Sequence, residues 1–521
     1  MQGMPRRQPS LAAKAAVLLA IVLLAGCALP PLEGRHMGTL TAPATPATSS
    51  LAGALVPQRN SHPGETGIYL LSDPIESFAA YTQLVRRAEQ SLDLQYYIWY
   101  DDRTGSLLLH ELLAAADRGV QVRLLLDDLG TRQLDAQLAA LHAHPNIRVR
   151  LFNPFVARGA RWLDFLTRFD RANRRMHNKV LIADGQAFIS GGRNIGDSYF
   201  GATEGFLFSD LDILATGAVV DEVTRGFDGY WQSRSAYPAD RILPPAPEGT
   251  LEAIDAKAAR VAEDEEMHEL LAAVEDNPVI DRLTTGGLDM IWAATAQVID
   301  DPDKGLGPVS HEDLLTLSLR GRLGVPRESV DIISPFFIPT PTLTEDLRIL
   351  ARRGVRIRVL TNSLDATDMA PAHAGYAPYR VPLLKAGVKL YEMRRLDDKT
   401  PNPSEYGLFG GSPATTLHAK AVVVDGHKVF IGSYNVDPRS VLLNTELGFV
   451  IDSPELAQAI SRPFDTSVPA TAYRLELDDG KIRWIEQQGD RVIRHEQEPG
   501  AGLVKRGTAW FFSLLPIEWL M

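Results

Sequence analysis

The hydrophobic pattern of this chain repeats one order of segments in two halves. In each half three short apolar runs typical of buried strands follow one another, at 91–100, 117–128 and 146–155 and then at 329–338, 352–363 and 387–393. Helical stretches separate the first and second runs and end at Gly119 and Gly354, a residue type that commonly stops a helix. Strands that alternate with helices predict a mixed, largely parallel α/β sheet in each half.

Changes in composition predict where the parts of the chain begin and end. We expect a signal segment at 1–26, a flexible tether at 27–65, a first α/β domain at 66–237, a linker subdomain at 238–287, a second α/β domain at 288–466, and a C-terminal hairpin with an apolar tail at 467–521. The linker is acidic, and a solvated, charged helix is the favoured interpretation of it. The hairpin is expected to turn at Asp479-Gly480.

The two halves also share an eighteen-residue frame, HNKVLIADGQAFISGGRN at 177–194 and HAKAVVVDGHKVFIGSYN at 418–435. The positions kept are His177, Lys179, Asp184, Gly191 and Asn194 in the first copy, and His418, Lys420, Asp425, Gly432 and Asn435 in the second. Side chains two residues apart on a strand share a face, so each histidine is expected to point the same way as its lysine. Two copies in one chain predict one active site built from two halves.

The residue types in this frame suit chemistry at phosphorus. An imidazole is a nucleophile or an acid and base near neutral pH. The ammonium of lysine and the amide of asparagine can stabilise charge that builds on phosphoryl oxygens. Downstream of each copy lies a carboxylate, Asp210 or Glu446, in matching local sequence. We expect these two to orient the histidines; which serves which is open, and Asp212 is an alternative to Asp210.

The pattern H-x-K-x4-D-x6-G-x2-N, present twice, resembles the signature of the phospholipase D superfamily. The resemblance implies two homologous α/β/α sandwich halves packed face to face, with the active site at their interface. It also implies a two-step transfer without metal or cofactor, in which His177 attacks phosphorus and His418 protonates the leaving alkoxide and then deprotonates the incoming alcohol.

The same resemblance implies roles for the other motif residues. The phosphoryl oxygens would be held by Lys179, Lys420, Asn194 and Asn435, while Asp184 and Asp425 would fix loop geometry. Ser433 matches the serine that often follows the motif glycine and is a further phosphate contact. The first copy departs from the pattern, because it has Gly192 at that position.

Four longer blocks make the chain similar to bacterial cardiolipin synthases of the C type: 95–102, 171–179, 373–380 and 437–449. That resemblance implies transfer of a phosphatidyl group to phosphatidylglycerol. His373, Tyr376 and Arg380 are candidates for headgroup contact. A hydrolytic phospholipase D, a nuclease and a catalytically dead, lipid-anchored scaffold are the alternatives.

Charge and targeting signals narrow the partners and the location. A net charge of -12 argues against nucleic acid as a partner. An apolar run after Arg6 and Arg7 ends in Leu24-Ala25-Gly26-Cys27, which looks like a bacterial lipobox, so we expect lipidation at Cys27 and an envelope protein facing the periplasm. Membrane phospholipids are the expected partners. Phosphatidylglycerol is the expected acceptor, and the donor is either phosphatidylglycerol or phosphatidylethanolamine. The need for a partner protein stays open, and a monomer would hold a complete site.

The end of the chain, WFFSLLPIEWLM, is apolar and aromatic but too short to cross a bilayer. The sequence leaves two interpretations of it. It lies in the membrane interface, where tryptophan and phenylalanine settle well, or it caps the protein core.

Overall fold

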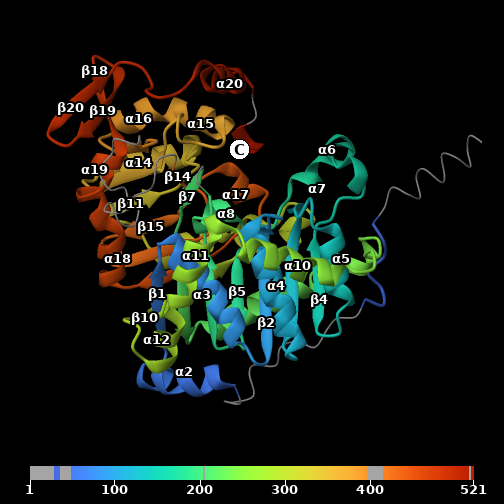
Figure 1. Ribbon diagram of the computed structural model, residues 1–521. Coiled ribbons are helices and arrows are strands. Elements are labelled where there is room, and N and C mark those ends of the chain that lie inside the picture. The colour runs from blue at the N-terminus through green and yellow to red at the C-terminus, as the bar shows by residue number, and fades with distance from the viewer. Residues whose placement is uncertain (1–28, 36–48, 204–205, 397–414, 516–517, 521) are drawn as a thin grey trace, which may run out of the picture.

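The computed structural model describes residues 29–35, 49–203, 206–396, 415–515 and 518–520, and shows two α/β halves joined along one continuous sheet (Figure 1). The predicted signal segment and Cys27 lie outside the described residues.

The first half is built on eight strands of that sheet. In spatial order they are β9 (Ala236–Pro238), β4 (Ile147–Phe152), β3 (Gln121–Gly130), β2 (Ser91–Ile98), β5 (Val180–Ala183), β6 (Ala187–Gly191), β8 (Asp212–Gly217) and β1 (Thr66–Leu71). The three parallel strands β2, β3 and β4 are the apolar runs predicted from the sequence, and the other pairings are antiparallel.

The second half continues the sheet from β1. In spatial order its strands are β10 (Ile291–Ile299), β17 (Leu447–Asp452), β16 (Lys428–Gly432), β15 (Ala421–Val424), β11 (Ser329–Ile333), β12 (Arg356–Asn362), β13 (Lys389–Met393), β18 (Ala472–Asp478), β19 (Lys481–Gln488) and β20 (Arg491–His495). The predicted hairpin is β18–β19, and its turn residues Asp479 and Gly480 have the positive φ of 48° and 77° that such a turn needs.

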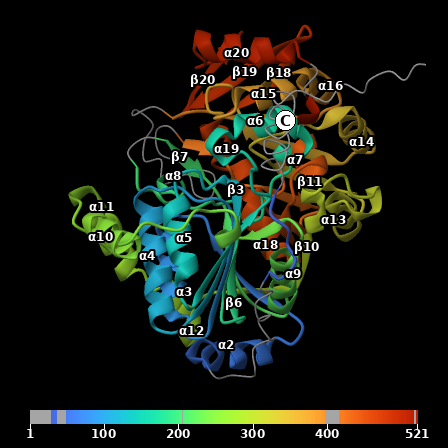
Figure 2. The same cartoon turned by 90° about the vertical axis from the view of Figure 1, so that its right-hand side faces the viewer.

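Helices cover the outer faces. The first half carries α2 (Ser50–Ser61), α3 (Pro74–Arg87), α4 (Arg103–Asp117), α5 (Asp135–Ala143), α6 (Trp162–Thr167), α7 (Phe169–Asn173), α8 (Asp197–Phe200), α9 (Val220–Gln232), α10 (Thr250–Ala262), α11 (Glu265–Asp276) and α12 (Val279–Thr285). The second half carries α13 (Leu315–Leu323), α14 (Thr340–Arg352), α15 (Ala370–Tyr376), α16 (Arg380–Lys385), α17 (Pro438–Leu442), α18 (Pro454–Ser461), α19 (Val468–Thr471), α20 (Leu503–Ser513) and the short 3-10 helix η8 (Glu518–Leu520). In Figure 2, α3–α5 lie on one side of the first sheet and α9 on the other.

A shared apolar core joins the halves, which confirms the predicted mixed α/β fold with two halves. Strand residues of both halves belong to one cluster, and Phe188 of the first half stacks on Phe449 of the second with ring centroids 5.1 Å apart. Separate clusters lie under the outer helices of each half. Burial of apolar surface on this scale holds the two halves in one fixed arrangement.

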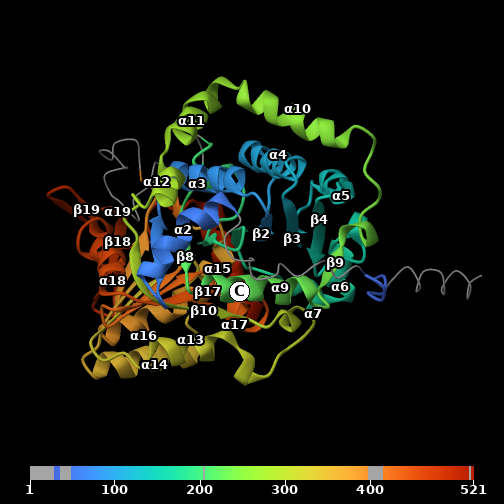
Figure 3. The ribbon, with the colours of Figure 1, turned by 90° about the horizontal axis from the view of Figure 1, so that it is seen from below.

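Two expectations about the connecting segments were wrong. The linker is not a single solvated helix, because α10 and α11 pack across α3, α4 and α5 as an outer layer (Figure 3). Their apolar positions, Ile254 and Leu270 among them, are buried in the core of the first half. The tether is not unstructured throughout, since 50–61 forms α2, capped by Ser49, and buries Leu51 and Leu55 one helical turn apart.

None of the described helices combines the length and apolar character needed to span a bilayer.

Candidate active site

Each motif copy is a tight hairpin that a carboxylate ties to the rest of its sheet. The hairpin β5–β6 turns at Asp184 and β15–β16 at Asp425, both with φ of 51°. Asp184 accepts hydrogen bonds from the backbone N–H groups of 89–91, and Asp425 accepts them from those of 327–329. Both aspartates therefore bind the backbone that enters β2 and β11.

The histidines lie at the contact between the halves, each held by a backbone bond from the opposite half. The His177 N–H donates to the carbonyl of Thr445 at 2.9 Å, and the His418 N–H donates to that of Ser209 at 2.8 Å. Next to His418 the short strands β14 (Thr415–Leu417) and β7 (Leu207–Ser209) pair in parallel. The residues that follow Thr445 and Ser209 are Glu446 and Asp210, so the pairing brings a carboxylate to each imidazole.

The carboxylates are therefore crossed between the halves. His177 Nδ1 lies 2.8 Å from Glu446 Oε2, and His418 Nδ1 lies 2.5 Å from Asp210 Oδ2. Because an ionised carboxylate only accepts, Nδ1 of each ring carries the proton and Nε2 keeps its lone pair. Asp212, the alternative, instead pairs with Arg193 at 3.3 Å and accepts from Tyr81.

Burial keeps both imidazoles neutral. It lowers the pKa of His177 well below its usual value, and the nearby charges of Lys179, Lys420 and Arg439 lower it further. It lowers the pKa of His418 to about 4, with Lys420 acting in the same direction and Asp210 against it. Both histidines are 7% exposed, so each can meet a ligand with little surrounding water. A neutral Nε2 in such a place is a competent nucleophile or base.

The pKa values of the two carboxylates are shifted in opposite directions. Burial raises the pKa of Glu446 to about 7, although Lys179 and Ser433 oppose the rise. Burial acts the same way on Asp210, but His418 and Lys420 outweigh it and hold the pKa of that carboxyl below its usual value.

The lysines are anchored beside their own histidines. Lys179 Nζ donates to the carbonyl of His177 at 2.5 Å and lies 5.3 Å from the centre of the Tyr97 ring. Lys420 Nζ donates to the carbonyl of His418 and lies 2.9 Å from its Nδ1. Burial lowers the pKa of Lys179, and it lowers that of Lys420 to about 8. An ammonium in so dry a place interacts strongly with a phosphoryl oxygen.

The asparagines of the motif differ in how much of their amide is engaged. Asn194 donates to the hydroxyl of Tyr199 at 2.8 Å and accepts from the N–H of Ile98 at 3.3 Å. Asn435 is buried, and within the described chain its Oδ1 has no hydrogen-bond partner.

Ser433 differs from the expected phosphate contact. Its Oγ donates to Glu446 Oε2 at 2.5 Å and accepts from the N–H of Leu447 at 3.0 Å. Its single proton is thus used to position the carboxylate. At the matching position of the first copy, Gly192 leaves room for the other carboxylate, because a Cβ there would lie 2.0 Å from Asp210 Oδ1.

The headgroup candidates lie together but bind partners within the protein. Arg380 is buried between Glu392 and Glu498, at 2.8 and 2.5 Å, and His373 Nε2 lies 2.6 Å from the same Glu498 carboxylate. The ring of Tyr376 lies under the guanidinium at 4.9 Å. The cavity that His373 and Tyr376 line measures about 10 Å³, room for roughly one water molecule. These contacts favour a packing role over direct headgroup contact.

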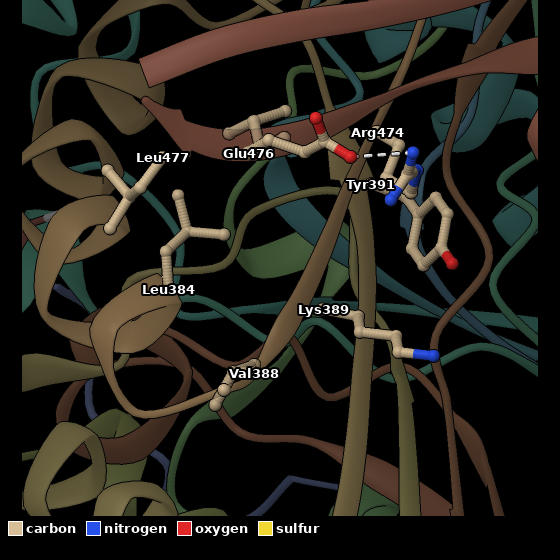
Figure 4. A pocket seen from close by; sticks show the side chains of 9 residues that line it. Leu384, Val388, Lys389, Tyr391, Arg474, Glu476 and Leu477 are labelled. Carbon is tan, nitrogen blue, oxygen red and sulfur yellow. Dashed lines mark ion pairs between the residues drawn. The ribbon is translucent and has the colours of Figure 1, made fainter. Parts of the chain in front are cut away.

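A larger groove lies elsewhere and has no catalytic group. It measures about 550 Å³ and runs between α16, β13 and β18, lined by Leu384, Lys389 and the ion pair of Arg474 with Glu476 (Figure 4). Neither motif histidine reaches it.

Three neighbours of the site escaped the sequence analysis. Tyr199 and Phe208 pack their rings against His418, with centroids 5.4 and 4.7 Å away. Arg439 lies close enough to His177 to lower its pKa. A signal existed for Arg439, which follows Asn435 by four residues and lies on α17. Tyr199 and Phe208 belong to the short helix α8 and the strand β7, where no motif spacing points to them.

Comparisons with known proteins agree with this geometry. A family model described as "Cardiolipin synthase, PLD-like domain" matches residues 81–231 and 319–468, one match in each half. The chain is 46% identical to cardiolipin synthase C of Escherichia coli (strain K12), over 90% of this chain and 99% of that protein. It is 31% identical to an uncharacterized protein of Helicobacter pylori, over 90% and 93%.

Among solved structures, phosphatidylserine synthase of Haemophilus influenzae Rd KW20 aligns with a TM-score of 0.55 at 14% identity, covering 91% of this chain and 100% of that one. That likeness concerns the fold alone. The family match in both halves and the identity over most of the chain establish membership: this chain belongs to the cardiolipin synthase family of phospholipase D-like proteins.

Proposed function

We propose that the protein is a phosphatidyltransferase that makes cardiolipin by transferring a phosphatidyl group to phosphatidylglycerol. The observation that carries the proposal is the pair of neutral, buried imidazoles, each with a carboxylate from the opposite half at Nδ1. One such group can act as the nucleophile, and the other can act as the acid once its Nε2 has bound a proton.

The free site holds both imidazoles neutral, so His418 first binds a proton at Nε2 together with the anionic phosphodiester. In the first step Nε2 of His177 attacks phosphorus, and the bond to the leaving alkoxide breaks as His418 gives that proton to the departing oxygen. The ring of His177 becomes positively charged, and Glu446 stabilises it. Lys179 and Lys420 stabilise the charge on the phosphoryl oxygens.

In the second step His418, now neutral, takes the proton of an acceptor hydroxyl as that oxygen attacks the phosphohistidine. The phosphorus–nitrogen bond breaks and His177 is restored. When the acceptor is the glycerol of phosphatidylglycerol, the product is cardiolipin; when it is water, the product is phosphatidic acid.

Substrate class rests on family membership. Cardiolipin synthase is the name carried by the family model and by the relative from Escherichia coli, and this supports membrane phospholipids as donor and acceptor. The low exposure of both histidines supports transfer over hydrolysis, since it limits access of water to the phosphohistidine.

The test is lipid mass spectrometry on the wild type and His177→Ala, with phosphatidylglycerol alone and then with phosphatidylethanolamine added. Cardiolipin made by the wild type and not by the variant is the expected result, and its dependence on the second lipid names the donor. Phosphatidic acid without cardiolipin would instead identify a hydrolase.

Anchoring is part of the proposal. The lipobox at 24–27 supports a lipid on Cys27 and a location in the cell envelope facing the periplasm. Metabolic labelling with a fatty acid that carries an alkyne should mark the wild type and leave Cys27→Ala unmarked. An unlabelled wild type would contradict a lipid anchor.

A further inference from the structure

Two short apolar segments far apart in the sequence come together at one end of the molecule. In Figures 1 and 2, α6, α7, α20 and the C-terminal end lie at that end, with α2 and α12 at the other. Most of the large apolar side chains that the described chain exposes belong to these segments or to residues beside them. On α6 and α7 they are Trp162, Leu163, Leu166 and Phe169, and near the C-terminus Leu503, Val504, Trp510, Phe511, Leu514, Leu515 and Trp519.

The apolar side chains of α20 do not contribute to the hydrophobic core. The helix packs against α15, yet none of its residues is buried. Trp510 is 65% exposed, and Leu166 on α6 is 74% exposed. The interpretation of the C-terminus as a cap on the core is therefore wrong, because it leaves its largest apolar side chains in water.

Direct contacts make the two segments one surface. The rings of Phe169 and Trp519 meet edge to face with centroids 6.0 Å apart. Arg439 on α17 donates to the carbonyls of Asn173 and Leu520 at 2.8 and 3.3 Å, so one guanidinium ties the end of α7 to η8. The same Arg439 is one of the charges felt by His177, which places this surface beside the active site.

Three basic side chains border the surface, two on α20 and one on α17. Lys505 and Arg506 on α20 donate to backbone carbonyls, as Arg439 does. Among the ion pairs of the described chain, none includes these three. Their positive charge is thus not cancelled by a carboxylate in direct contact, although the whole protein carries -12.

We propose that this surface, which we call the docking face, lies in the interface of a bilayer that contains anionic lipid. Tryptophan and phenylalanine favour the headgroup level, leucine the acyl chains, and lysine and arginine the lipid phosphates. No single part is long enough to span a bilayer, but the two parts together, joined next to the active site at Arg439, would hold that site close to the lipid surface. The inference rests on the proposed function for why a lipid must reach His177.

Fluorescence quenching tests the docking face separately from catalysis and from any lipid anchor. The full chain carries His177→Ala so that it does not consume the lipid, and with its seven tryptophans intact it serves as the wild type of this experiment. It is mixed with vesicles of phosphatidylglycerol and phosphatidylcholine, with bromine atoms on the acyl chains of one lipid. Residues 1–48 hold no tryptophan, so an N-terminal anchor adds no signal. We expect bromolipid to quench the wild-type indoles, and Trp162→Phe, Trp510→Phe and Trp519→Phe each to lose part of that quenching.

The matched control is Trp292→Phe at the opposite end, where the indole stacks on His62 with centroids 4.1 Å apart. Its replacement should leave the vesicle-dependent quenching unchanged. Equal quenching in all four variants, or none in the wild type, would overturn the docking face.

Charge insertion gives the second measurement. Leu166→Glu with Leu514→Glu, compared with Val325→Glu, which is 72% exposed, should reduce turnover of phosphatidylglycerol in vesicles by about tenfold or more and spare turnover of a short-chain, monomeric phosphatidylglycerol. An equal loss of turnover on both substrates would contradict a lipid partner for this face. A dimer in vesicle-free solution that the same two substitutions convert to monomer would contradict it too, because the face would then bind a second copy of the chain. Normal turnover without quenching would overturn the docking face and leave the proposed function standing.

Discussion

Glu446 of the second half accepts a hydrogen bond from His177 of the first, with Oε2 2.8 Å from Nδ1. Its counterpart joins Asp210 of the first half to His418 of the second. Neither half thus holds a complete pair, and the backbone bonds at Thr445 and Ser209 that create the crossing are as much part of the site as the side chains.

The two histidines are expected to fail in different ways. His177→Ala removes the nucleophile and should lower activity by about 10⁴-fold or more, with no covalent phosphatidyl adduct. His418→Ala should slow turnover by a similar order but let the adduct accumulate with an activated donor, because resolution lacks its base. Intact-protein mass spectrometry measures the adduct. His110→Ala, an exposed histidine paired with Asp255, is the control, and normal turnover in either motif variant would contradict the assignment.

The pH dependence should follow Glu446. Its pKa is raised to about 7, so lowering the pH through 7 adds a proton to the carboxylate that stabilises the charged His177 ring, and kcat should fall. Glu446→Gln should lower kcat by about 10²- to 10⁴-fold and abolish this acid limb.

Asp210→Asn serves as the comparison, since the pKa of Asp210 lies below its usual value and its ionisation does not change near pH 7. That variant should lose rate but keep the limb. The measurement is kcat from pH 5.5 to 8.5 (a range of about three units), and a limb near pH 7 that survives in Glu446→Gln would assign it to another group.

Gly192→Ala should disable the site by crowding. The new Cβ would lie 2.0 Å from Asp210 Oδ1, and the carboxylate that serves His418 must move. We expect kcat to fall by about 10- to 100-fold and stability by about 1–3 kcal/mol. Gly229→Ala on α9, where a Cβ meets nothing within 4 Å, is the matched control and should be neutral or slightly stabilising. Full activity of Gly192→Ala would mean that Asp210 can shift without cost.

Asp425→Ala should lower the free energy of unfolding and leave kcat nearly unchanged. It removes the acceptor of three backbone N–H groups and leaves alanine at a φ of 51°. We expect a loss of about 2–3 kcal/mol in the free energy of unfolding, measured by urea denaturation, with kcat per folded molecule nearly unchanged. Asp276→Ala, on the exposed end of α11, should change neither. A selective loss of kcat would give Asp425 a direct part in catalysis.

The parts of the site that lie within one short stretch of sequence could be predicted from it. The hairpin motifs and the parallel strands follow from residue spacing and apolar runs, and the family match confirms the two-half α/β fold. The carboxylate partners could not be assigned, because the crossing depends on which backbone of one half pairs with the other. The role of Ser433 was missed for the same reason, as its acceptor is fixed by the position of Glu446.

The helices outside the repeat were harder to predict. Leu51 and Leu55 look like isolated apolar residues in a stretch rich in small ones, and only the folded first half shows that they pack into its core. The segment 250–276 was interpreted as solvated because of its many acidic residues, although it has an apolar face that includes Ile254 and Leu270. The docking face was missed at α6 because nothing in the sequence shows that 162–169 and the C-terminus come together in space.

The crossed carboxylates also bear on when the protein becomes reactive. A chain whose first half has folded alone carries His177 with no carboxylate at Nδ1, and Asp210 with no imidazole to serve. The two crossed pairs on which the proposed chemistry depends require the second half to be joined to the first, through the pairing of β1 with β10. Either half produced alone would hold a motif histidine without its carboxylate, so we expect a complete site only after both halves have folded together.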